Sequence, residues 1–402
     1  GGVVWRFRAA SRTAFLITAV ANDHLSATAT VLSPVVGDFL SGFGAPVTTW
    51  SWGAWSDAEG WPTSVCFFKE RLLFARGRQI WASCVGDYAN FAARIADSIE
   101  PSSAISINIA TGRAEEVQWL AGADECLIGT VGGLLILGPL TDQEPFGPGN
   151  AGIRPGPAVG AAPLQPVETA TTQALFVDMT HQRLREVSYG GQGVGYQAPD
   201  LNRLADHILK PGVIDIAYQQ QLESCVICVL ENGQLAAVTY DAQQEVFAWS
   251  RSAIAGGAVE AIQCIPYPGT DNRRDDVWLI VRRTIGGQTK RYVEVLELPY
   301  VAPARLCGET RAQYQARAKL EVAKAFHVDS GLSRNGAPVT TVSGLDHLNG
   351  ETVAILGDGA IQTDIQAGGM ASASTRWRMP GSLTAAPSGE TTDTRRAFRV
   401  RR

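Results

Sequence analysis

Short apolar segments recur in groups along the chain, and turn residues separate the segments within each group. One group, for example, holds apolar runs at 214–218, 224–230, 234–240 and 246–250. The groups follow one another at intervals of roughly 45 residues, the period expected of β-propeller blades. The recurrence therefore predicts a mainly β chain with a β-propeller-like domain. The groups occupy residues 64–83, 117–137, 174–189, 214–250 and 259–298.

Tight turns are predicted inside these groups at Asn232-Gly233 and Gly286-Gly287. Asn and Gly accept the positive φ that two-residue hairpin turns require. The 42 Gly and 20 Pro among 402 residues also suit many short strands joined by turns. The turn residues therefore agree with the strand assignment.

The remaining segments flank or interrupt the propeller-like region, which we assign to residues 50–308. Residues 1–49 read as an N-terminal β segment, the remnant of a platform or docking region. Residues 141–166 are rich in Pro and Gly and predict a long loop. Residues 309–325 lack both Gly and Pro and predict a connecting helix. Residues 326–402 predict a small all-β C-terminal module, with strands near 352–356, 360–366 and 375–379.

A shorter helix is predicted over residues 202–209. Leu204, Ala205, Ile208 and Leu209 follow a helical spacing there, and Pro211 lies just beyond.

Charge is nearly balanced along the chain, with 34 Lys and Arg against 39 Asp and Glu and a net charge of -5. This balance argues against a surface that binds nucleic acid tightly over its whole extent. The dense basic cluster at the C-terminal end has two readings. It contacts DNA phosphates or an acidic partner, or it is an internal strand in which Phe398 and Val400 alternate with arginines. The cluster consists of Arg395, Arg396, Arg399, Arg401 and Arg402.

The seven cysteines lie mostly in apolar, strand-like segments, which favours free buried thiols in a protein assembled in a reducing cytoplasm. Cys225 and Cys228 have the spacing of a metal-ligand pair. In a strand, however, residues i and i+3 point to opposite faces, so one ion cannot easily take both. Asp275 and Asp276 are expected at a solvated hairpin tip and not in a calcium site.

These patterns predict no catalytic, cofactor or metal site, and the chain is not expected to be an enzyme. The longest apolar segments are also far too short to span a bilayer.

The tryptophans divide into two sets. Trp81, Trp119, Trp249 and Trp278 lie in apolar strands and are expected to anchor blade cores. In contrast, Trp50, Trp52, Trp55 and Trp61 lie in loop-like sequence and are the better candidates for an exposed or interface role.

Residues 60–91, GWPTSVCFFKERLLFARGRQIWASCVGDYANF, resemble the tail nozzle family of short-tailed bacteriophages, also called tail tubular protein B. The shared elements are a Gly-x-Pro turn, an Arg-Leu-x-Phe strand, a Trp-x-Ser strand and a Gly-Asp-x-x-Asn-Phe turn. Further matches follow in the family's order, including Asn-Gly-Gln-Leu at 232–235 and Gly-Leu-Asp-His-Leu-Asn-Gly at 344–350. The resemblance covers roughly residues 50–360.

The resemblance implies a structural protein of the virion tail, assembled in the host cytoplasm. Such subunits form a ring, commonly a homohexamer, that extends the DNA channel, retains the genome and lets double-stranded DNA pass during ejection. The implied partners are copies of the chain itself, the tail adaptor protein and tail fibre or spike proteins, and no cofactor is implied. We expect a channel with an acidic or neutral wall, narrowed by loops such as 141–166 or 190–195. The alternative is a β-propeller receptor- or glycan-binding module of a phage tail.

Overall fold

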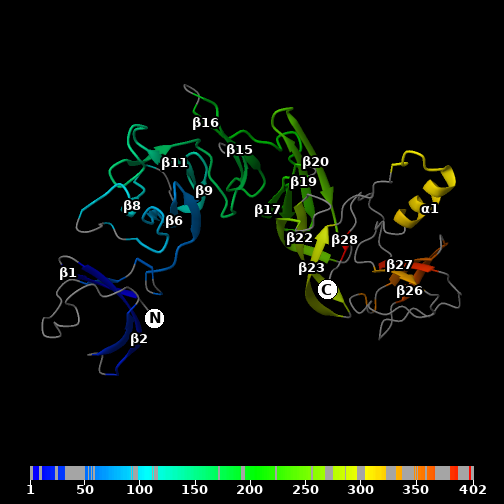
Figure 1. Ribbon diagram of the computed structural model, residues 1–402, viewed down its shortest axis with the longest axis horizontal. Helices are drawn as coiled ribbons and strands as arrows, with labels where there is room; N and C mark the ends of the chain where they lie inside the picture. Colours follow the sequence, from blue (N-terminus) through cyan, green and yellow to red (C-terminus); the bar gives the residue numbers. More distant parts are fainter. Residues whose placement is uncertain are drawn as a thin grey trace. The chain divides into compact units, whose positions relative to one another are not determined.

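Nearly all of the regular secondary structure in the computed structural model is β-strand (Figure 1). Among the described residues, the strands form seven four-stranded sheets, and there is one helix, α1 (Arg311–Val322). The mainly β class is thus confirmed. The structure describes residues 3–8, 11–22, 26–31, 50–52, 54–55, 57, 59–91, 93, 98–110, 112, 116–170, 173–191, 195–221, 224–254, 257–267, 275–285, 287–296, 304–322, 332–336, 348, 350, 352–357, 360–366, 381–387 and 398–399.

The chain divides into two compact units, and each is described by itself. The first unit contains residues 1–179 and 186–199, and the second contains residues 180–185 and 200–402.

Blade-type sheets dominate the first unit. In each, strands that follow one another in sequence are neighbours in the sheet, which is the simplest antiparallel meander. The first sheet holds β5 (Ser64–Phe68), β6 (Arg71–Arg76), β7 (Gln79–Ala82) and β8 (Ile105–Asn108). The second sheet holds β9 (Val117–Gly122), β10 (Cys126–Thr130), β11 (Gly133–Pro139) and β12 (Ala151–Pro155). The third sheet holds β13 (Val167–Ala170), β14 (Gln173–Val177), β15 (Leu184–Tyr189) and β16 (Tyr196–Gln197).

The second unit has a fourth sheet with the same pattern and a fifth sheet whose first three strands follow it, whereas its fourth strand comes from residues 398–399. At the predicted Asn232-Gly233 turn, Gly233 has φ +80°, a conformation that glycine adopts readily. The fourth sheet holds β17 (Val213–Gln219), β18 (Cys225–Leu230), β19 (Leu235–Asp241) and β20 (Val246–Ser252). The fifth holds β21 (Gly257–Pro266), β22 (Asp275–Ile285), β23 (Gln288–Leu296) and β28 (Phe398–Arg399).

Within each unit, successive blade-type sheets pack through their apolar faces. One core cluster joins the first and second sheets, another joins the second and third, and a third joins the fourth and fifth. Every residue of β10 and β18 is buried, because both faces of these strands are covered. This explains why they are continuous apolar runs and not alternating ones. The predicted propeller-like class agrees with these successive blade-type sheets.

Two further four-stranded sheets lie toward the ends of the chain. The predicted N-terminal β segment is present as β1 (Val3–Arg8), β2 (Ser11–Val20), β3 (Ala27–Val31) and β4 (Trp50–Trp52). The predicted C-terminal β module contains β24 (Leu332–Gly336), β25 (Thr352–Gly357), β26 (Ala360–Gln366) and β27 (Gly381–Pro387). The strand predicted near 375–379 lies outside the described residues.

Three sequence predictions differ from the structure. The loop predicted over 141–166 contains β12, which pairs with β11 through Leu137 and Ile153. Residues 398–399 pair with β23 of the fifth sheet, so they do not belong to the sheet of the C-terminal module. Residues 202–209 form consecutive turns and not the predicted helix.

The side chain of Asn202 explains the missing helix. It is fully buried, and its Oδ1 accepts a hydrogen bond of 3.1 Å from the backbone N–H of Leu184. Its Nδ2 donates one of 3.0 Å to the carbonyl of Gln182. An Asn that bridges backbone groups in this way favours turns over helix. Leu204, assigned to the apolar face of the predicted helix, is instead fully exposed.

Candidate functional site

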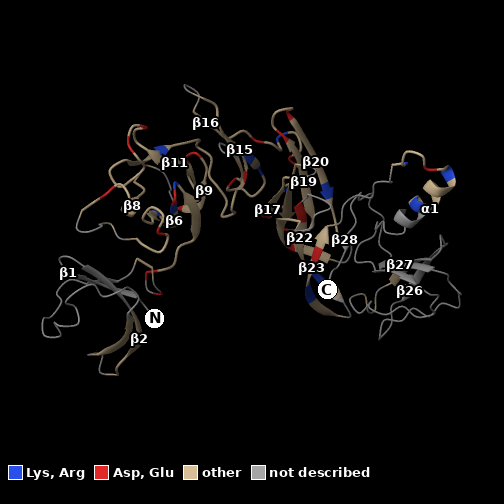
Figure 2. Cartoon of the chain, in the orientation of Figure 1, with Lys and Arg blue, Asp and Glu red and all other residues tan. Residues whose placement is uncertain are grey.

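The predicted basic cluster is only partly within the described residues. Arg395, Arg396, Arg401 and Arg402 lie outside them. Arg399 lies in β28, where it is the backbone partner of Val295 in β23. The pairing places this residue in the edge strand of the fifth sheet. Figure 2 shows acidic and basic residues interspersed over the described strands and loops of both units.

The thiols behave as the strand geometry predicts. All seven cysteines are free. Cys225 belongs to the core between the fourth and fifth sheets, together with Ile227 and Val229, whereas Cys228 lies on the other face of β18. Burial raises the pKa of Cys228 to about 12, so the thiol stays protonated. No group of three metal-ligating side chains occurs within the described part of the chain.

Asp275 and Asp276 do not lie at a solvated hairpin tip, so that prediction is wrong. They open strand β22 and are both buried. The Asp275 carboxylate accepts a hydrogen bond of 2.8 Å from the backbone N–H of Gln221, and its carbonyl accepts one of 2.9 Å from Gln219 Nε2. Asp275 therefore joins the fifth sheet to the fourth.

Two motif residues of segment 60–91 hold neighbouring loops through hydrogen bonds. Arg71 is fully buried, and its guanidinium donates hydrogen bonds to the carbonyls of Ser83, Ser103 and Pro101 at 2.5 to 2.7 Å. Asn90, in the Gly-Asp-x-x-Asn-Phe turn, accepts a backbone hydrogen bond of 2.7 Å from Cys84. These residues fix loops onto the first sheet.

The tryptophans follow the sequence prediction only in part. Trp119 is fully buried against Phe176, as predicted, but Trp81, Trp249 and Trp278 are only half-buried. Trp61, one of the four tryptophans expected to have an exposed or interface role, is 56% exposed. Trp55, however, packs edge-on against three aromatic rings, those of Phe74, Trp81 and Phe91.

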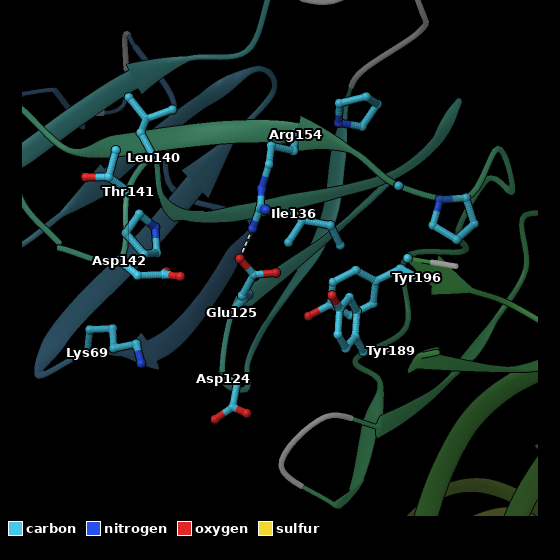
Figure 3. A pocket seen from close by; sticks show the side chains of 15 residues that line it. Lys69, Asp124, Glu125, Ile136, Leu140, Thr141, Asp142, Arg154, Tyr189 and Tyr196 are labelled. Atoms are coloured by element: carbon cyan, nitrogen blue, oxygen red, sulfur yellow. Dashed lines mark hydrogen bonds and ion pairs between the residues drawn. The ribbon is translucent and has the colours of Figure 1, made fainter. Parts of the chain in front are cut away.

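The clearest candidate binding site in the first unit is a cleft of about 1010 Å³, here called the tyrosine cleft (Figure 3). The second sheet and its loops supply most of the lining, and the β15–β16 hairpin supplies the rest. Its side chains include Lys69, Asp124, Glu125, Ile136, Leu140, Thr141, Asp142, Arg154, Tyr189 and Tyr196.

Two tyrosines form one side of the tyrosine cleft. Tyr189 in β15 and Tyr196 in β16 are directly opposite in the antiparallel pairing. Their ring centroids are 5.2 Å apart and the planes are inclined by 54°. Tyr189 is 47% exposed, so its ring is available to a ligand. Burial raises the pKa of the Tyr196 phenol, which keeps its hydroxyl protonated and able to donate.

An ion pair between Glu125 and Arg154 lies in the middle of the tyrosine cleft (Figure 3). Glu125 precedes β10, and Arg154 lies in β12, the edge strand of the same sheet, with β11 between them. Gly138, in the strand between them, leaves room for the carboxylate, because a Cβ there would lie 2.7 Å from Glu125 Oε1.

The loop that carries Leu140, Thr141 and Asp142 forms another side of the tyrosine cleft (Figure 3). The buried side chain of Asn150 holds this loop. Its Oδ1 accepts a hydrogen bond of 2.9 Å from the Thr141 N–H, and its Nδ2 donates to the carbonyls of Thr141 and Glu144 at 2.9 and 2.7 Å. This part of the predicted loop is therefore internally braced.

The arrangement combines an aromatic surface with carboxylates and a guanidinium. Such a set binds ligands that present both C–H faces and hydroxyl groups. Sequence reasoning missed this site because its residues come from segments between 69 and 196. The only available signal was the spacing of Tyr189 and Tyr196 on either side of the Gly190–Gly195 turn.

Comparisons with known proteins add little. No family model matches the chain, and no curated protein matches it. Among solved structures, the chain is similar to the Swd1 β-propeller domain of Myceliophteria thermophila, with 13% identity and a TM-score of 0.35, covering 61% of this chain and 68% of that one.

It is also similar to an exo-β-1,3-galactanase of Phanerochaete chrysosporium, with 10% identity and a TM-score of 0.31, covering 85% of this chain and 96% of that one. A luciferin-regenerating enzyme matches at 9% identity and a TM-score of 0.23, over 53% of this chain and 80% of that one. Likenesses this weak carry no argument about function. Within the described residues, no helix is long and apolar enough to cross a membrane.

Proposed function

We propose that this chain is a structural subunit of a bacteriophage tail nozzle. Copies of it form a ring, a hexamer in the resembled family, which extends the DNA channel, retains the genome and releases it into the host. Support comes from the order of the sequence motifs between residues 60 and 350. Further support comes from the buried, loop-fixing position of Arg71 in the first of these motifs. The proposal includes the tail adaptor and the fibre or spike proteins as partners, and it places the chain in the virion.

The observation that carries this proposal is an exposed apolar surface on the first sheet, here called the β5 face. Ser64 and Phe68 are buried, whereas Val65 and Phe67 between them are 49% and 64% exposed. Tyr88, which is 45% exposed, lies edge-on to Phe67 at 5.2 Å. Exposed aromatic groups on a sheet face are typical of subunit contacts. A second copy of the chain is the occupant that we propose.

The assembly is tested by light scattering and electron microscopy of the purified chain. We expect a closed ring whose mass is a multiple of the protomer. Phe67→Ser should shift the mass toward the monomer, while Leu204→Ser, at a fully exposed leucine in the second unit, should not. Circular dichroism checks that both variants remain folded. A wild-type protein that stays monomeric at every concentration would contradict the proposal.

The channel is the part of this proposal that a ring structure tests directly. A net charge of -5 is compatible with an acidic or neutral wall, which does not trap DNA phosphates. A continuous Arg and Lys lining would overturn this mechanism.

A second candidate function is a propeller module that binds a receptor or glycan, and the tyrosine cleft favours it. This candidate predicts a stable monomer with measurable ligand affinity. In neither candidate do we assign the chain an enzymatic reaction, because its distinctive side chains pair with one another or brace loops.

A further inference from the structure

We propose that the tyrosine cleft is a binding site for a neutral oligosaccharide. The inference rests on the second candidate function, that of a binding module, and it does not depend on ring assembly. It names a ligand class and the residues that would select it.

The tyrosine pair supplies the apolar part of such a site. Sugar rings present C–H groups on their faces, and these pack against aromatic rings whose polar edges stay hydrated. Tyr189 offers an exposed ring, and Tyr196 supports it from the neighbouring strand at 5.2 Å. The inclination of 54° between the rings gives the wall two facets, so that adjoining sugar units can contact different rings. The volume of about 1010 Å³ is at the upper end of the ~300–1,000 Å³ typical of ligand pockets, which leaves room for several sugar units.

The polar lining selects hydroxyl groups. Asp142 and Asp124 are exposed carboxylates that accept hydrogen bonds, and the exposed guanidinium of Arg154 retains donors beyond its bond to Glu125. Across the lining, three acidic side chains (Asp124, Glu125 and Asp142) face two basic ones (Lys69 and Arg154), an excess of one negative charge. This excess disfavours phosphorylated or sialylated ligands by like-charge repulsion.

A proline-rich peptide is the other ligand that aromatic-lined grooves commonly bind. The ion pair of Glu125 and Arg154 in the middle of the cleft argues against it, because proline residues have no N–H or hydroxyl group to donate to the Glu125 carboxylate. The sugar hydroxyls can instead bond to both members of the pair.

The cleft is also organised before any ligand arrives. Asn150 fixes the loop with Thr141 and Asp142 through hydrogen bonds of 2.7 to 2.9 Å. The backbone bonds of Gly190 and Gly195 close the hairpin that carries both tyrosines. Such bracing lowers the entropic cost of ordering a site on binding.

The test begins with an array of neutral and sialylated oligosaccharides probed with the full chain. The best neutral glycan is then titrated by calorimetry against wild type, Tyr189→Ala and Asp142→Asn. Phe247→Ala is the control, since it removes an exposed aromatic side chain that lies outside both the cleft and the β5 face. We expect neutral glycans to bind, affinity to fall about tenfold or more in each cleft variant, and the Phe247 variant to match wild type.

The outcomes distinguish a wrong binding site from a wrong binding function. Glycan binding that survives both cleft substitutions overturns this site but leaves a glycan-binding module in place. No saturable binding at millimolar glycan overturns both. Preference for sialylated glycans, or binding of a polyproline peptide in the same cleft, overturns the ligand class.

Discussion

Among the described residues, one arginine in each unit is buried in a blade-type sheet, and the two guanidinium groups have different partners. Arg71 in the first sheet donates to backbone carbonyls of Ser83, Ser103 and Pro101. Arg283 in the fifth sheet makes a bidentate ion pair with Glu294 on the neighbouring strand. Its Nε donates to Oε1 at 2.7 Å and its Nη2 donates to Oε2 at 2.9 Å. The side chains of Arg71, Arg283 and Glu294 are almost entirely excluded from solvent.

The difference shows two ways to keep a charge inside a sheet. Carbonyl partners belong to loops, so Arg71 ties chain segments about 30 residues away onto β6. The carboxylate partner belongs to the adjacent strand, so Arg283 and Glu294 add cross-strand pairing that the backbone already provides. Burial lowers the pKa of Arg71, because nearby dipoles replace water incompletely. Its Nε finds no partner among the described residues.

The largest effect is expected for Arg71→Leu. The change removes the donor of three short hydrogen bonds and leaves buried carbonyls unpaired. Hydrogen bonds to charged groups contribute about 1.5–3 kcal/mol each, so we expect a loss of roughly 5 kcal/mol in the free energy of unfolding. Urea unfolding measures it, with Arg78→Leu at an exposed arginine of the same sheet as control. A loss under about 1 kcal/mol would mean that the loops hold without Arg71.

The ion pair in the fifth sheet should respond differently to single and double substitution. Glu294→Gln leaves the Arg283 charge without its counter-ion and should cost about 3 kcal/mol. The double change Arg283→Met with Glu294→Leu removes both charges at similar volume and should be close to neutral. The same urea titration compares the three proteins. If the double variant is as unstable as the single one, the ion pair itself stabilises the fold and does more than neutralise two buried charges.

Sequence patterns predicted the strands better than these interior charges. Apolar runs and turn residues locate β17, β18, β19 and β20 within a residue or two, because side-chain period and turn geometry are local properties. Arg71 follows Lys69-Glu70, a turn-like context that is normally solvated. Nothing local indicates that loops from 101 and 103 return to cover it.

The tyrosine cleft escaped prediction for the same reason. Its walls come from β10, β12, the 140–142 loop and the β15–β16 hairpin, which only tertiary packing brings together. Asp275 likewise looked solvated, since its partner Gln221 lies 54 residues away. When partners far away in the sequence determine whether a residue is buried, the local sequence pattern cannot predict its environment.

The difference expected between two tryptophans, one in each unit, is smaller than the loss expected at Arg71. Trp119 is 1% exposed, so Trp119→Ala should cost about 3–5 kcal/mol. Trp249 lies half-buried on the edge strand β20, where its indole donates a 3.1 Å hydrogen bond to the carbonyl of Leu201. Trp249→Ala should therefore cost only about 1–2 kcal/mol. Equal losses in thermal or urea unfolding would contradict the distinction between an enclosed and an edge position.

The smallest effect is expected on the exposed face of the fifth sheet, where Glu260 bonds to Arg291 at 2.5 Å and to Arg282 at 2.9 Å. The bond to Arg291 is the main cause that lowers the pKa of Glu260. A lowered carboxyl pKa stabilises the fold above the pKa of the unfolded chain, and this stabilisation disappears as the pH falls through the folded value.

Glu260→Gln should therefore differ slightly from wild type at pH 7 and in low salt, and the difference should vanish toward pH 3. Added salt should reduce it as well, because solvent screens exposed pairs. Urea midpoints measured for both proteins between pH 7 and pH 3 check the sign. A difference that instead grows on acidification would mean that Glu260 is stabilised as the neutral acid.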